Sequence, residues 1–257
     1  MSETESGGPK VVTAAVIVIG NELLSGRTRD KNLHYLAGRL TELGVRLQEA
    51  RVIPDVEDVI VATVNQLRAR FDYVFTSGGI GPTHDDITAD AIAKAFGVGI
   101  DYHPEALKIL GAQYQPGEFN QARKRMARIP LGGVLVANPV SRAPGFRLEN
   151  VYVFAGVPAI LRAMFEGIRH ELVGGTPVMS RTISSAVPEG RMARGLEDLQ
   201  GRYPEVEMGS YPYYRTGAFG TSIVLRSVDR DQLDAAARDL KQLIRDLGQE
   251  PVEGEAA

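Results

Sequence analysis

Residues 76–90 combine a glycine turn with a cluster of carboxylates, and the residues concerned are Gly78, Gly79, Gly81, Asp85, Asp86 and Asp90. Glycine permits positive φ and removes the Cβ atoms that would keep a ligand away from the backbone amides. Free amides at the start of a helix attract phosphate. Because the aspartates would repel a bare phosphate, the pattern indicates a divalent cation shared between carboxylates and phosphate oxygens. The candidate metal ligands are Asp85, Asp86 and Asp90, and the candidate metals are Mg, Mn and Co.

The same segment also has a purely structural interpretation. Thr83, followed three residues later by Asp86, resembles a capping box at a helix start, and the apolar residues that follow have helical spacing. Glycine turns after strands are common in α/β proteins. Neither the G-x-G-x-x-G dinucleotide fingerprint nor the Gly-Lys-Ser/Thr of a P-loop is present at the turn. Both interpretations stay open at this point.

Residues 77–90, Ser-Gly-Gly-Ile-Gly-Pro-Thr-His-Asp-Asp-Ile-Thr-Ala-Asp, resemble the signature of the molybdopterin-binding MoaB/Mog-like superfamily. The resemblance is closest to its CinA-type branch, which includes the amino-terminal domain of eukaryotic FAD synthases. Residues 20–32 resemble the CinA-type segment G-N/D-E-L-L-x-G…D-x-N. The resemblance implies that Glu22, Asp30 and Asn32 lie near the ligand pocket. The residues expected to contact phosphate or pterin are Ser77, Gly78, Gly79, Gly81, Pro82, Thr83, Glu22 and Asn32.

A second aspartate of the family pattern corresponds to Asp55, in the segment Ile53-Pro54-Asp55. The resemblance implies that Asp55 and Asp86 face each other across the pocket as the working acids. Two carboxylates from separate strand ends can hold a metal or divide acid and base roles between them. Asp55 also suits the start of the helix predicted to follow it.

The apolar run at residues 12–19 is typical of a central parallel strand covered on both faces. Further strands are predicted at residues 45–53, from Tyr73, and within 134–139 and 151–158, where each segment ends in a turn, with helices between them. Together with the resemblance, this order predicts an α/β fold: a three-layer MoaB/Mog-like domain at residues 11–173 with a mostly parallel sheet.

Residues 101–130 are predicted to form a helical excursion, with a core stripe of Phe119, Ala122, Met126 and Ile129. Its basic face is expected to be solvated. Residues 141–145 resemble the family hairpin G-T-A-P-G, but Ser141 and Arg142 replace its glycine and threonine. Arg142 thus offers an additional phosphate contact.

Gly174-Gly175-Thr176-Pro177 marks the predicted domain boundary. Residues 177–248 are expected to form a small α+β domain with a structural or dimerising role, in which Pro212 indicates an edge strand or a bulge. Residues 1–10 and 249–257 are expected to be disordered tails.

The 257 residues include 29 basic and 32 acidic side chains, a net charge of −3, which argues against nucleic-acid and membrane partners. The absence of cysteine excludes disulfides and thiolate metal sites and is compatible with the cytosol. The first ten residues lack a signal peptide pattern, and the run at 12–19 is too short to span a bilayer. We therefore expect a cytoplasmic protein that binds a small phosphorylated ligand.

The leading hypothesis is a metal-dependent pyrophosphatase that acts on a nucleotide such as ADP-ribose or FAD, substrates that the resemblance supplies. In it Asp85 and Asp86 hold the cation, and Asp55 positions or deprotonates water. The alternative is a non-hydrolytic binder of molybdopterin or a related phosphorylated pterin in molybdenum cofactor metabolism. The resemblance also implies a homodimer.

Overall fold

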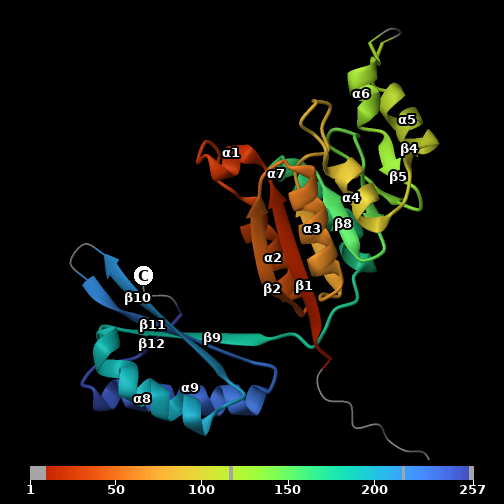
Figure 1. Cartoon of the computed structure of the whole chain (residues 1–257). Helices are drawn as coiled ribbons and strands as arrows, with labels where there is room; N and C mark the ends of the chain where they lie inside the picture. The colour runs from red at the N-terminus through yellow and green to blue at the C-terminus, as the bar shows by residue number, and fades with distance from the viewer. Residues whose placement is uncertain (1–9, 116–117, 216–217, 255–257) are drawn as a thin grey trace, which may run out of the picture. The chain divides into compact units, whose positions relative to one another are not determined.

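The computed structural model describes residues 10–115, 118–215 and 218–254. The chain divides into two compact units, one of residues 10–175 and one that begins at Thr176 (Figure 1). Each unit has its own sheet and its own hydrophobic core. In the described part of the chain, no helix combines the length and the apolar character needed to cross a membrane.

The first unit contains a six-stranded sheet with the order β2-β1-β3-β8-β7-β6. Four neighbouring strands run parallel, and β7 and β6 are antiparallel to their neighbours. The predicted mostly parallel sheet is therefore confirmed. The strand bounds are β1 (Val12–Ile19), β2 (Val45–Ile53), β3 (Tyr73–Ser77), β6 (Val134–Val136), β7 (Gly145–Leu148) and β8 (Val151–Phe154).

Helices cover both faces of this sheet, and successive residues of β1 pack against opposite layers. Ala15 and Ile17 pack in the core on the side of α3 (Glu57–Arg68) and α4 (Thr88–Phe96). Val16 and Val18 pack on the side of α2 (Asn32–Glu42) and α7 (Pro158–Ile168), which is followed by the short helix η1 (Arg169–Glu171). Burial on both faces explains why β1 is a nearly continuous apolar run, and it gives the expected three layers.

The carboxyl ends of the four parallel strands meet at one edge of the sheet. β1 ends at Gly20 and the short helix α1 (Asn21–Leu24), β2 ends at Pro54 and Asp55, and β3 ends at the glycine turn. β8 ends at Phe154, and Gly156 follows two residues later, where an added Cβ would meet the Gly78 backbone. This edge is where α/β sheets place ligands.

The excursion between α4 and β6 is not one helical region. It contains β4 (Ile100–Tyr102), α5 (Pro104–Gly111), α6 (Gln121–Arg125) and β5 (Arg128–Pro130). Phe119 precedes α6, Met126 follows it, and Ile129 lies in β5, which pairs with β4. The predicted helical stripe is therefore wrong, because strand pairing with β4 ends the helix before Ile129 is reached.

The second unit is a four-stranded antiparallel sheet with the order β10-β11-β9-β12, packed against two helices, as the predicted α+β class requires. β10 lies at the edge of the sheet, as Pro212 indicated. The bounds are β9 (Met179–Ser185), α8 (Glu189–Arg202), β10 (Glu207–Arg215), β11 (Ala218–Ser227), α9 (Arg230–Asp246) and β12 (Val252–Glu253).

The predicted disordered tail at 249–257 is wrong for its described part. Val252 and Glu253 form β12 and pair with β9. The Glu253 carboxylate accepts hydrogen bonds from Lys241 at 2.6 Å and from Arg181 at 3.2 Å, and Lys241 lowers the pKa of Glu253. These contacts order the segment in spite of its polar sequence. Residues 1–9 and 255–257, the remainder of the predicted tails, lie outside the described residues.

Candidate functional site

A cavity of about 540 Å³ opens at the carboxyl ends of the parallel strands. It contains most of the residues that the sequence singled out, although they are spread over more than sixty positions of the chain. The predicted site residues that line it are Glu22, Asp55, Gly78, Gly79, Gly81, Pro82, Asp85 and Asp86.

The glycine turn packs directly on the neighbouring elements. Gly78 and Gly79 have φ values of 110° and 69°, in the region that favours glycine. A Cβ atom at Gly78 would strike the carbonyl oxygen of Ile19, and one at Gly79 would strike the Thr88 hydroxyl. The two glycines are therefore required for the turn to reach the end of β1 and the start of α4.

The helix after the turn begins at Thr88 and not at the predicted capping box. Thr83 and Asp86 do interact, because the Thr83 backbone N–H and hydroxyl donate to Asp86 Oδ2 at 2.8 and 2.5 Å. They lie in the loop before α4, whose N-cap residue is Ile87. No side chain caps α4, and Thr88, its first residue, holds the helix to the turn: its hydroxyl donates to the Gly78 carbonyl and its N–H to the Gly79 carbonyl, each at 3.0 Å. The Thr88 amide is thus already used within the turn.

Asp85 and Asp86 are adjacent carboxylates at the rim of the turn. Hydrogen bonding from the Thr83 side chain lowers the pKa of Asp85, and the neighbouring backbone and His84 act in the same direction. The single hydroxyl proton of Thr83 points at Asp86 Oδ2, so the two carboxylates compete for it. A lowered pKa means that these contacts favour the ionised form of Asp85, which is the form that binds a cation.

Asp55 faces the cavity from the end of β2. Its Oδ2 accepts a hydrogen bond from the N–H of Asn21, the first residue of α1, at 2.9 Å. The alternative role as a cap of the following helix is not observed, since the N-cap of α3 is Val56 and no side chain caps it. Asp55 therefore joins the ends of β1 and β2 at the cavity wall.

Asn32 and Ser77 line a smaller adjoining cavity of about 50 Å³, which shares Glu22 and Gly156 with the main cavity. Asn32 is 5% exposed, and its Nδ2 donates to Ser77 Oγ at 2.8 Å and to the Gly156 carbonyl at 2.7 Å. Asp30 accepts from the Asn32 and Leu33 amides at the start of α2. Asn32 thus fixes the ends of β3 and β8 relative to each other.

We expect Asn32→Ala to lower the free energy of unfolding by about 2 to 3 kcal/mol, because two hydrogen bonds are lost and the buried Ser77 hydroxyl loses the Asn32 donor. Urea denaturation measures this change. The matched substitution Asn65→Ala removes a single partly exposed contact to Arg68 and should cost at most about 0.5 kcal/mol. Equal losses for both variants would contradict a positioning role for Asn32.

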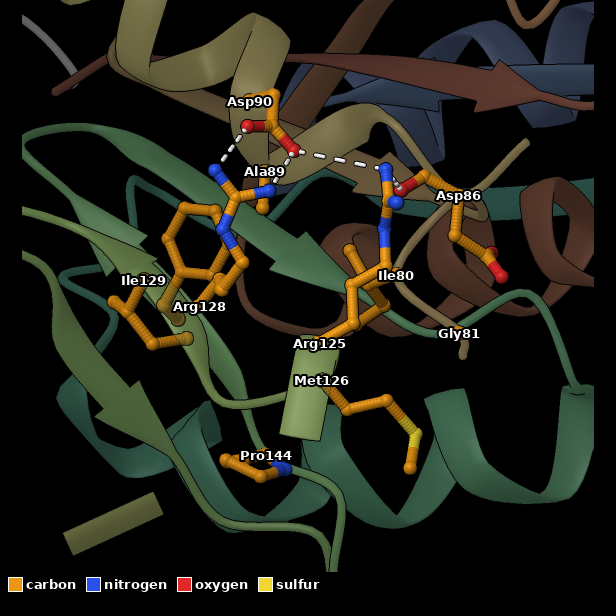
Figure 2. Close-up of a pocket in the computed structure, with 12 residues that line it drawn as sticks. Ile80, Gly81, Asp86, Ala89, Asp90, Arg125, Met126, Arg128, Ile129 and Pro144 are labelled. Atoms are coloured by element: carbon orange, nitrogen blue, oxygen red, sulfur yellow. Dashed lines mark hydrogen bonds and ion pairs between the residues drawn. The ribbon is translucent and has the colours of Figure 1, made fainter. Parts of the chain in front are cut away.

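Asp90, the third predicted metal ligand, does not line the main cavity. It lines a small adjoining pocket, in which Figure 2 shows its carboxylate facing Arg128 and Arg125. Its carboxylate is paired with the Arg128 guanidinium at 2.7 and 2.9 Å, and Arg125 lies 4.0 Å away. Arg128 therefore supplies the positive charge that the prediction assigned to a metal. In the described ranges, no group of three or more His, Asp or Glu side chains is close enough to form a metal cage of protein ligands alone.

Sequence reasoning missed the contribution of the loop after β6. Asn138 and Ser141 line the cavity, and Asn138 Oδ1 accepts from the Val140 and Ser141 amides at 3.1 Å. Its Nδ2 donates to Ser141 Oγ and the Ala143 carbonyl. An asparagine followed by proline, at the end of a predicted strand, was the available signal. Arg142, the expected phosphate contact, lines a different groove.

The comparisons with known proteins agree with this geometry. The family model described as "Probable molybdopterin binding domain" matches residues 15–174, which is more than half of the chain. The chain belongs to the probable molybdopterin binding domain family. A second model, "FAD synthase, middle domain", matches residues 177–251.

Relatives of this chain include a protein of Pyrobaculum calidifontis, which is 37% identical to it over 211 residues. The match covers 78% of this chain and 80% of the relative. A probable FAD synthase of Caenorhabditis briggsae is 30% identical over 90% of this chain, and the chain spans about half (49%) of that relative's length. The crystal structure of the protein CinA from Thermoplasma acidophilum, whose function is described as unknown, has 31% identity and a TM-score of 0.60. It covers 63% of this chain and 98% of its own. The CinA-type resemblance is thereby confirmed.

Proposed function

We propose that the main cavity binds the pyrophosphate group of a nucleotide through a divalent cation and hydrolyses it, with ADP-ribose and FAD as leading substrates. One observation carries this proposal. The described lining of the cavity includes four carboxylates, from Glu22, Asp55, Asp85 and Asp86, and neither lysine nor arginine. A phosphorylated ligand in this cavity therefore meets no cationic side chain of the lining, and Arg125, which contacts the Asp86 carbonyl, lines the adjoining pocket. A divalent cation would supply the counter-charge inside the cavity.

The carboxylates fit a cation that is shared with the ligand. Mg²⁺ is commonly held by one or two carboxylates together with substrate phosphates and water, and it does not need a protein cage. Asp85 and Asp86 are adjacent, and the Thr83 contacts orient Asp86 at the turn. We therefore assign the cation, Mg, Mn or Co, to these two residues and leave Asp90 out.

The bound cation would neutralise phosphate oxygens and lower the pKa of a coordinated water. Asp55 is held through Oδ2 by the Asn21 amide, and we assign its Oδ1 to position the attacking water and accept its proton. The water oxygen bonds to one phosphorus as the bridging P–O bond breaks, and the second phosphate leaves with the bridging oxygen. FAD would yield AMP and FMN, and ADP-ribose would yield AMP and ribose 5-phosphate.

Binding of the product AMP should depend on the metal. With Mg²⁺ we expect AMP to bind at least about tenfold more tightly than in EDTA, a coupling free energy of at least about 1.4 kcal/mol. Isothermal titration of AMP into the chain, with and without Mg²⁺, measures this difference. Equal affinity in the two buffers would contradict the metal-bridged geometry.

A second candidate is a binder of molybdopterin or a related phosphorylated pterin without hydrolysis, which the family description favours. Co-purified ligand distinguishes the two. Pterin-like fluorescence in excess of nucleotide absorbance in the purified protein would favour the binder, and nucleotide absorbance without it would favour the hydrolase.

A further inference from the structure

A second groove of about 510 Å³ lies between α5 and the loop that follows β6. β6 is the last strand of the six-stranded sheet, so the side facing away from β7 is an open edge. In an antiparallel pair, alternate residues direct their N–H and C=O groups away from the partner strand. The groove therefore combines backbone donors and acceptors with mostly apolar walls, and its lining includes Ile109, Leu135, Pro139, His103, Glu105 and Arg142.

This lining suits a planar heterocycle. Small-molecule sites are concave and largely apolar, with a few polar groups that fix orientation, and their usual volumes include this one. An aromatic ring with edge nitrogens and oxygens can pack on the apolar walls and pair with the open backbone of β6. Arg142 can stack on such a ring or contact an adjacent phosphate.

The backbone at Arg142 is strained in a way that serves this arrangement. Arg142 has φ of 62°, and among the described residues only it and Glu149 are non-glycine residues with positive φ. This conformation is unfavourable for a non-glycine residue, and strain of this kind concentrates at functional sites. Ser141 and Ala143 line the main cavity, whereas Arg142 and Pro144 line the groove.

The groove and the main cavity are separated by one segment of chain. Asn138 lines both of them, and its side chain holds the intervening loop through the bonds to Ser141 and to the Ala143 carbonyl. The loop of residues 138–144 is therefore a common wall of the groove and the main cavity.

We propose that this groove binds one heterocyclic ring of a dinucleotide whose pyrophosphate lies in the main cavity. The proposal rests on the proposed function and narrows its substrate class to pyrophosphates that carry two ring systems, of which FAD is an example. ADP-ribose, with a sugar in place of the second ring, fills the two cavities less completely.

Val134→Trp tests the proposal by filling the groove. Val134 is 54% exposed and lines the groove, so the larger side chain projects into it without entering the core. We expect the KM for FAD, or the Kd where FAD binds without turnover, to rise about tenfold, which corresponds to ~1.4 kcal/mol. The affinity for inorganic pyrophosphate, which has no ring, should stay within about twofold. The control is Val52→Trp, another exposed strand valine (45%) that lines neither cavity.

Each outcome decides a different point. An unchanged KM or Kd for FAD in Val134→Trp overturns the groove proposal. An equal loss of affinity for FAD and for pyrophosphate overturns it too, because it would show damage to the main cavity. Wild-type protein that binds FAD without cleaving it overturns the hydrolysis alone. Wild-type protein that binds neither ligand with Mg²⁺ overturns both proposals.

Discussion

Asp86→Asn should lower metal-dependent AMP formation by at least about 100-fold, because it removes the charge that holds the cation while it keeps the shape of the side chain. Asparagine can still accept the Thr83 N–H bond through its amide oxygen, so the loop before α4 should keep its conformation. Initial rates of AMP release with saturating Mg²⁺, together with the metal concentration at half-maximal rate, measure the effect.

Asp90→Asn is the matched control, since it makes the same change four residues later. Asp90 is paired with Arg128 outside the main cavity, so this variant should lose stability more than activity. Its metal dependence should stay close to that of wild type. AMP formation at the wild-type rate in Asp86→Asn, or a larger kinetic loss in Asp90→Asn, would show that the metal ligands are assigned wrongly.

Gly78→Ala should lower the free energy of unfolding by about 3 kcal/mol and abolish ligand binding, because φ at this position is 110° and the added Cβ meets the Ile19 carbonyl. The clash is with backbone at the end of β1, so a side-chain rotation cannot relieve it. Chemical denaturation and AMP titration of the same samples measure the two effects.

Gly38→Ala is expected to raise the free energy of unfolding, in contrast to Gly78→Ala. Gly38 lies inside α2 with open space around its missing Cβ, so alanine should raise stability by about 0.5 to 1 kcal/mol. If both glycine variants have wild-type stability and affinity, the turn does not depend on the absence of a side chain at Gly78.

Much of the fold follows from local pattern. The nearly continuous apolar run of β1 predicted cover on both faces, and it is covered on both. Pro212 indicated an edge strand or a bulge, and β10 is an edge strand. The errors arose where non-local contacts determine the outcome. Ile129 has helical spacing from Met126 but pairs with β4, and the polar segment at 252–253 is ordered by partners on β9 and α9.

The candidate site likewise has parts that local sequence predicts and parts that depend on distant residues. The glycine turn and the strand ends could be placed from the sequence, because parallel strands bring their carboxyl ends to one edge. The partner of Asp90 could not be predicted from the sequence, since Arg128 lies 38 residues away and nothing local distinguishes Asp90 from Asp86. Nor did the sequence show that Arg142 and Ser141, adjacent in the chain, line different cavities.

The most direct test of the central claim is product analysis by chromatography. Purified protein is incubated with FAD and, separately, with ADP-ribose, with Mg²⁺, Mn²⁺, Co²⁺ or EDTA, beside Asp86→Asn. The metal-bridged cavity predicts AMP only in the presence of metal and only with wild-type protein, and the groove predicts that FAD is the better substrate. Absence of turnover with every metal, together with tight binding of a pterin that persists in EDTA, would contradict the account.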